Sequence, residues 1–166
     1  MRVSAGSLGT LSGWAVVVSF FSQMGTTLMS QAATKPVPVP DEISAPFFNG
    51  AREGKLILQH CSGCDRWSFP VRERCPHCFA ARLEWRQASG RGTLYTFTVM
   101  HQVMNPGFAS AVPYNVAQVD LEEGVRMVSN VVGIRNDALR VGMKLEAVFE
   151  DVGESVSLPK FRPVAG

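Results

Sequence analysis

Two pairs of cysteines are the residues of this 166-residue chain whose type and spacing point most directly to chemistry. Cys61 and Cys64 form the first C-x-x-C pair, and Cys75 and Cys78 form the second after ten intervening residues. Two such pairs can place four thiolates around one metal ion in a tetrahedron. The chain has no other cysteine, and disulfides gain most when they close long loops, so a disulfide framework is disfavoured. The spacing predicts one structural Zn²⁺ per chain.

Other interpretations of these cysteines remain open. A Cys₄ site can also hold iron, which would make the chain an electron carrier. A single C-x-x-C can be a redox dithiol, but that motif opens a helix within a βαβ unit, whereas these pairs lie between short predicted strands. His60 and His77 adjoin the pairs, and we expect them to be surface residues or neighbours of the ligands. Four thiolates leave no open position, so the metal is not expected to be catalytic.

The segments that position the cysteines are predicted to be a helix and a short β-ribbon. Asp41 or Ser44 can cap a helix that has Pro46 in its first turn. Residues 55–60 are predicted to form a strand that leads into the first pair, and residues 67–70 the return strand of a hairpin.

The rest of the chain is predicted to be all β. In the first strand, alternation places Tyr95, Phe97 and Val99 on one face, and Pro159 is expected to break the last strand. Five strands favour an OB-like barrel over a sandwich, which needs about seven. The predicted fold class is therefore mainly β, with an amino-terminal helix and a rubredoxin-like zinc ribbon (41–88), then an OB-fold five-stranded β-barrel (89–166). The predicted strands span residues 93–101, 114–121, 125–132, 143–149 and 155–161.

Residues 1–40 are expected to be an unstructured leader followed by a proline-rich linker. Val3 to Thr34 carries no charged residue, and its apolar run is shorter than the roughly 20 residues of a spanning helix. One interpretation is a secretory signal, although Arg2 would be its only basic side chain. The other is that translation starts at Met29, in which case a chain beginning there should fold as well as the full chain. Reduced thiols favour a cytoplasmic location.

Charge is unevenly distributed along the chain. The formal net charge is only +2, which implies neither nucleic acid nor an anionic membrane as a partner. Residues 52–91 nevertheless hold eight basic and four acidic side chains, whereas the chain from Tyr114 onward holds six basic and eight acidic ones. An anionic ligand is therefore expected near the cysteines.

The order of the short motifs resembles that of the DUF35 family, zinc-ribbon plus OB-fold proteins associated with acyl-CoA metabolism. The resemblance covers about residues 41–163, and Asp65 departs from it where the family usually has glycine. The motifs that carry it are Pro46-Phe47-Phe48, Gly54-Lys55-Leu56, the two cysteine pairs, the run from Gly90 to Thr98, Pro113-Tyr114 and Gly142-Met143.

The resemblance implies a non-catalytic accessory subunit that binds acyl-CoA and scaffolds a thiolase-like or aldolase partner, sometimes with a hydratase. The partner would supply the catalytic groups for making or breaking a carbon–carbon bond. The chain itself has no free cysteine nucleophile, and His101 is expected to be a polar barrel residue. Candidate contacts to the phosphates of the CoA thioester are Arg72, Arg74, Arg82, Arg86 and Arg91.

Two expectations about surfaces accompany this hypothesis. Phe47 and Phe48, together with Met104 and Phe108 of the connection 102–113, either contact the partner or cover the chain's own core. The alternative function is binding of single-stranded nucleic acid, for which Tyr95, Phe97 and Tyr114 could stack bases. The nearly balanced charge argues against that function, because a nucleic-acid face needs a continuous basic surface.

Overall fold

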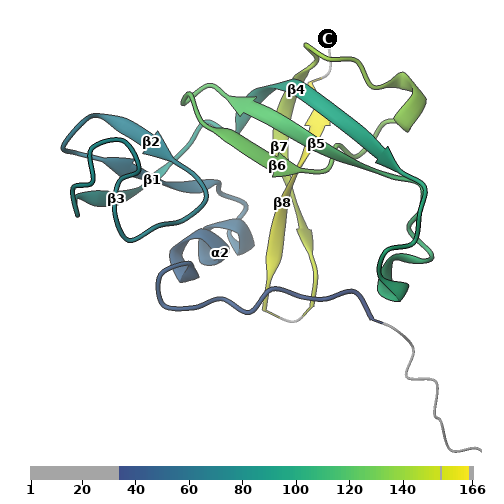
Figure 1. Ribbon diagram of the computed structural model, residues 1–166, viewed down its shortest axis with the longest axis horizontal. Helices are drawn as coiled ribbons and strands as arrows, with labels where there is room; N and C mark the ends of the chain where they lie inside the picture. The colour runs from purple at the N-terminus through teal and green to yellow at the C-terminus, as the bar shows by residue number, and fades with distance from the viewer. Residues whose placement is uncertain (1–33, 154, 165–166) are drawn as a thin grey trace, which may run out of the picture. The chain divides into compact units, whose positions relative to one another are not determined.

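The computed structural model describes residues 34–153 and 155–164, so most of the expected leader lies outside the described residues. It contains a helix, a three-stranded sheet and a five-stranded sheet (Figure 1). The predicted fold class, mainly β with a helix before the ribbon and the barrel, is confirmed. The elements are α2 (Ala45–Arg52), β1 (Ile57–Cys61), β2 (Arg66–Ser68), β3 (Leu83–Gln87), β4 (Arg91–Met100), η1 (Pro106–Phe108), β5 (Tyr114–Leu121), β6 (Arg126–Ser129), η2 (Asn136–Ala138), β7 (Lys144–Asp151) and β8 (Ser157–Pro163).

Helix α2 begins where its sequence predicts. Ser44 is the N-cap residue, and its backbone N–H donates to the Oδ1 of Asp41 over 2.7 Å. Pro46 occupies the first turn, where its missing N–H costs nothing. A side chain at Gly50 would collide with Ile57, so this glycine lets β1 pass close to the helix.

The three-stranded sheet has the order β2-β1-β3, with antiparallel pairs, and it confirms the predicted hairpin. The central strand carries Gln59, whose side-chain amide both donates to and accepts from the backbone of Arg72, each over 2.8 Å. This double contact fixes the chain between the two cysteine pairs. Strand β3 is a third strand that the sequence analysis did not predict.

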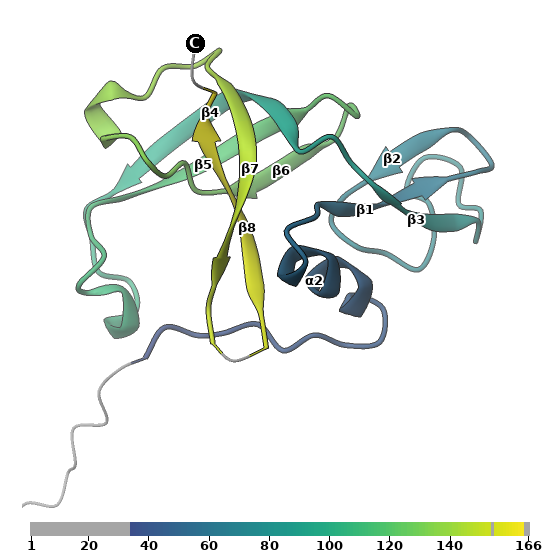
Figure 2. The ribbon, with the colours of Figure 1, turned by 180° about the vertical axis from the view of Figure 1, so that it is seen from behind.

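The five-stranded sheet has the order β6-β5-β4-β7-β8, and its strands correspond to the five that were predicted (Figure 2). The chain after β6 returns to the opposite edge of the sheet, where Val131 forms a parallel bridge with Phe161. Phe161 also donates to the carbonyl of Asn130 over 3.0 Å and accepts from Val132 over 2.7 Å. These contacts curl the sheet into the partly closed barrel of an OB-fold.

The expected alternation along β4 is wrong at Tyr95. The register with β5 shifts between Leu94 and Thr96, which makes a β-bulge. Leu94 is fully buried, Tyr95 is 48% exposed and Phe97 is partly buried, so Tyr95 and Phe97 do not share a face. A bulge adds one residue to one strand and reverses the alternation beyond it.

Pro159 does not break the last strand, which is a second correction. It lies within β8 opposite Phe149 of β7. Proline is tolerated in an edge strand, because its missing donor need not pair with a further strand. Its carbonyl accepts a hydrogen bond from the hydroxyl of Ser129 over 2.7 Å.

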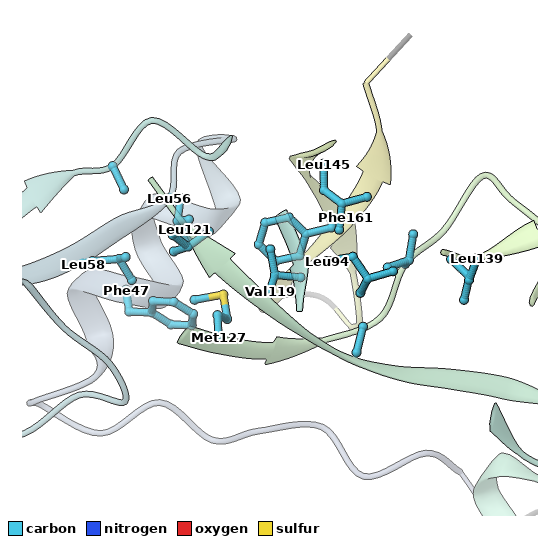
Figure 3. Close-up of a cluster of buried hydrophobic side chains, with 13 residues drawn as sticks. Phe47, Leu56, Leu58, Leu94, Val119, Leu121, Met127, Leu139, Leu145 and Phe161 are labelled. Carbon is cyan, nitrogen blue, oxygen red and sulfur yellow. The ribbon is translucent and has the colours of Figure 1, made fainter. Parts of the chain in front are cut away.

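One hydrophobic cluster joins the helix, the ribbon and the barrel (Figure 3). Phe47 of α2 and Leu58 of β1 belong to the same buried set as Met127 and Phe161 of the barrel. Of the two alternatives left open for Phe47, the structure supports the second, because its ring is buried in the chain's own core. Phe48 packs against this core and is only half buried.

Replacing Phe47 should test this assignment. We expect Phe47→Ala to lower the free energy of unfolding by about 3 kcal/mol or more, because it leaves a cavity in the shared core. Phe48→Ala, the matched control, should cost about 1 kcal/mol, since its ring is only half buried. Urea unfolding of both variants measures the difference, and equal costs would contradict the placement of Phe47.

Candidate metal centre

The four cysteine sulfurs converge on one point. All four lie within 4.8 Å of one another, and the Sγ atoms of Cys61 and Cys78, and of Cys64 and Cys75, are 3.6 Å apart. A tetrahedral zinc site with bonds of about 2.3 Å requires sulfur separations of about 3.8 Å. The cysteines are therefore positioned to bind one metal ion, as the spacing predicted.

The two cysteine pairs have the same local backbone. The residue after each pair, Asp65 or Phe79, has a positive φ of 56° or 60°. Its N–H donates to the carbonyl of the first cysteine, Cys61 or Cys75, over 2.8 or 2.9 Å. Each knuckle thus turns sharply around the metal position, and Asp65 keeps this turn although the related proteins were expected to have glycine there.

Without a metal ion, the thiols of Cys64 and Cys75 have pKa values that are shifted in opposite directions. Burial and hydrogen bonds with the neighbouring thiols raise the pKa of Cys64 to about 12. Burial also disfavours the thiolate of Cys75, but the backbone N–H groups of His77 and Cys78 donate to its sulfur and lower the pKa of that thiol to about 6. A metal ion would replace the protons on these sulfurs, and Zn²⁺ suits an all-thiolate set.

The two histidines lie beside this set, as expected, and the group of possible ligands contains only the cysteines. His60 is buried, packs edge-on against Trp67, and places its Nε2 3.1 Å from Asp65. Exposed His77 places its Nδ1 3.4 Å from a guanidinium nitrogen of Arg66. His60 and Asp65 together brace the first knuckle.

The five arginines predicted to contact CoA do not converge on one cavity. Arg72 and Arg74 lie in the loop between β2 and β3, Arg86 pairs with Glu84 on β3 over 2.9 Å, and all five are exposed. Arg91 differs, because it lines a polar pocket of about 240 Å³ beside Lys55. The remaining arginine of the set is Arg82, which directly precedes β3.

A cavity of about 340 Å³ at one end of the barrel was missed by the sequence analysis. Its cations are Lys35, Arg135 and Lys160, and its aromatic residues are Phe108 and Tyr114. Lys35 lies 5.6 Å from the centre of the Phe108 ring. These residues come from the linker, two connections and two strands, so no local pattern in the sequence brings them together.

A buried asparagine forms the floor of this cavity. Asn115 donates to the carbonyl of Val131 over 2.8 Å and to the side chain of Asn136 over 2.9 Å. It also accepts from the N–H of Val131 over 2.7 Å, so its amide is well satisfied. Exposed His101 lies on a neighbouring pocket that shares Arg135 and Asn136 with the cavity.

Within the described part of the chain, every helix falls short of the length and apolar character needed to cross a membrane.

Two family models match consecutive parts of the chain. Residues 48–84 match the rubredoxin-like zinc ribbon domain of ChsH2, and residues 85–150 match its C-terminal OB-fold domain. A DUF35 domain-containing scaffold protein of Pyrococcus furiosus is 35% identical over 133 residues, which cover 75% of this chain and 95% of the relative. This chain belongs to the DUF35 family. It therefore has the zinc ribbon and the OB-fold that the motif order implied.

Other relatives are subunits of larger enzymes. A probable enoyl-CoA hydratase alpha subunit of Thermomonospora curvata is 34% identical over 79% of this chain, which spans 40% of the relative's length. A benzoylsuccinyl-CoA thiolase subunit of Geobacter metallireducens is 30% identical over 57% of each protein. A solved structure described as an Ltp2-ChsH2(DUF35) aldolase matches with a TM-score of 0.68 at 34% identity, over 76% of this chain and 98% of the matched chain.

Elemental analysis tests the metal assignment. We expect one zinc per chain, and Cys64→Ser should weaken zinc binding by about 100-fold or more, because it removes a ligand and not only an outer contact. Ser62→Ala is the matched control in the same knuckle. Chelation should make residues 57–87 sensitive to proteolysis, since metal binding energy is also folding energy. Iron, or a folded chain without metal, would refute the assignment.

Proposed function

We propose that this chain is an accessory subunit that binds acyl-CoA and scaffolds a thiolase-like or aldolase partner. The observation that carries this proposal is the closed set of four cysteine ligands in a chain of the DUF35 family. Four thiolates leave no coordination position for substrate, and the chain has no cysteine outside the set to act as a nucleophile. The partner therefore supplies the catalytic groups.

The names of the relatives support this kind of partnership. An aldolase, a thiolase and a hydratase each occur among them, and all three classes can act on CoA thioesters. The chain would make or stabilise a complex that forms or cleaves a carbon–carbon bond. The exposed part of the connection between β4 and β5, with Met104 70% exposed, is a candidate contact region for that partner.

The barrel-end cavity is our preferred place for part of the CoA molecule. CoA carries a diphosphate and a 3′-phosphate, and three cations line the cavity. Arg135 also pairs with Asp137 and Lys160 with Glu150, each over 2.7 Å, and the third cation is Lys35. Phe108 and Tyr114 supply aromatic surface for the adenine. The exposed arginines of the ribbon are the competing site, and Arg91 lines the polar pocket beside Lys55.

Assembly with the partner tests the scaffold role. Co-expression of the full chain with the thiolase-like, aldolase or hydratase protein encoded beside it should give a hetero-oligomer on size exclusion. The chain alone should show no turnover, while the complex should release or consume CoA. Full activity of the partner without this chain would refute the proposal.

Affinity for CoA tests the cavity. We expect Lys35→Ala and Lys160→Ala each to weaken CoA binding roughly 10-fold or more, because each removes a charged phosphate contact. Lys144→Ala is the control, since this lysine donates to Thr93 on β4 over 3.0 Å and does not line the cavity. Calorimetry on the complex measures all three variants. If Arg74→Ala weakens binding and the two lysine variants do not, the phosphates bind at the ribbon.

A further inference from the structure

The second knuckle carries an exposed aromatic side chain on a strained backbone. Phe79 has a φ of 60°, and it is 74% exposed. A positive φ is uncommon for any residue other than glycine and is a true outlier for a bulky side chain. Glycine adopts this conformation without the steric cost. The chain therefore bears the cost of a phenylalanine at a position where glycine would fit more easily.

Hydrogen bonds to backbone groups of the second knuckle, not contacts of the ring, hold this backbone. Phe79 donates to the carbonyl of Cys75 over 2.9 Å, and Cys75 donates to the carbonyl of Ala80 over 3.0 Å. The carbonyl of Phe79 accepts from Arg74 over 3.4 Å. The knuckle is thus closed by backbone groups that any residue at position 79 would supply. The ring does not belong to the hydrophobic cluster found among the described residues.

The matching position in the first knuckle behaves differently. Asp65 has the same backbone conformation, but its carboxylate lies 3.1 Å from buried His60. Asp65 thus makes an intramolecular contact that explains its identity. Phe79 has no aromatic or cation–π partner among the described residues. Contacts within the described residues therefore do not account for its identity.

Three arginines lie near Phe79: Arg74 donates to its carbonyl, Arg66 contacts His77 two residues before it, and Arg82 follows it by three residues. Arg66, Arg74 and Arg82 are exposed, and within residues 34–153 and 155–164 none of them forms an ion pair with a carboxylate. The carboxylates of this region do not cancel that charge. Glu84 is paired with Arg86, and the exposed carboxylates Asp65 and Glu73 offset only part of the charge of the three arginines.

We propose that Phe79, flanked by Arg66, Arg74 and Arg82, is a docking knob that inserts into an apolar pocket rimmed by carboxylates on the partner subunit. This inference rests on the proposed function, because it takes the thiolase-like, aldolase or hydratase protein as that partner. Aromatic and arginine side chains dominate the binding energy of protein interfaces. A nucleic acid fits less well, because the net charge of +2 does not provide an extended basic surface.

Phe79→Gly separates docking from folding. Glycine relieves the positive φ, so the variant should keep one metal per chain and melt at the same temperature or higher. The same variant should bind the partner about 10-fold more weakly or worse, because it removes the ring. Val141→Ala is the control, since Val141 is an exposed apolar residue of the barrel and should leave binding unchanged. Calorimetry with the purified partner supplies the affinities.

Charge supplies the second measurement. Arg74→Glu should weaken partner binding relative to the wild type, and this loss of affinity should be larger in low salt than in high salt. Salt screens the attraction between opposite charges at the rim, so the charge of Arg74 matters less when the salt concentration is high. If the wild type binds the partner and Phe79→Gly binds it equally well, the docking knob is overturned, while the proposed function stands. Failure of the wild type to bind the partner would overturn both. Loss of single-stranded RNA binding in Phe79→Gly at physiological salt, with partner binding intact, would replace the protein partner by a nucleic acid.

Discussion

The coupling of the metal site to the hydrophobic core through β1 is the constraint on which the rest of the structure depends. This strand places Leu58 in the shared core and ends at Cys61, one of the four ligands, and both side chains are fully buried. The segment between the cysteine pairs forms little regular structure, so metal bonds replace the apolar burial that stabilises a larger domain. The geometry of the knuckles is therefore linked to the barrel through β1 and through β3, which pairs with β1 and leads into Ala88 of the shared core.

Local patterns explain why much of this arrangement could be predicted. The spacing of the cysteines is sufficient for the metal set, because each C-x-x-C pair is satisfied within its own turn. Strand β5, from Tyr114 to Leu121, alternates partly buried and buried side chains without interruption, and its limits agree with the prediction. The helix was found from Ser44 and Pro46, which act within one turn.

The features that escaped prediction depend on contacts between distant residues. The bulge before Thr96 depends on the pairing of β4 with β5, so the sequence of β4 alone does not predict it. Once it is present, Tyr95 turns outward and Arg126 covers its ring at 3.3 Å, while also pairing with Asp120. The barrel-end cavity likewise needs Lys35 and Lys160 to meet, which depends on the fold of the whole chain. The five arginines looked like one group only because they are close in sequence.

Asp65 and Phe79 occupy equivalent positions in the two knuckles, but the reasons that explain Asp65 there do not apply to Phe79. Asp65 suits a positive φ because short polar side chains tolerate that conformation, and it also braces His60. Phe79 lacks both justifications, so folding alone does not explain it. A closed metal site contributes shape but no open coordination position, and its hydrogen-bonded knuckle fixes the backbone from which the Phe79 side chain projects. A fixed backbone lowers the entropy lost when the residue enters a pocket, which suits a subunit whose contribution is to bind and position other proteins.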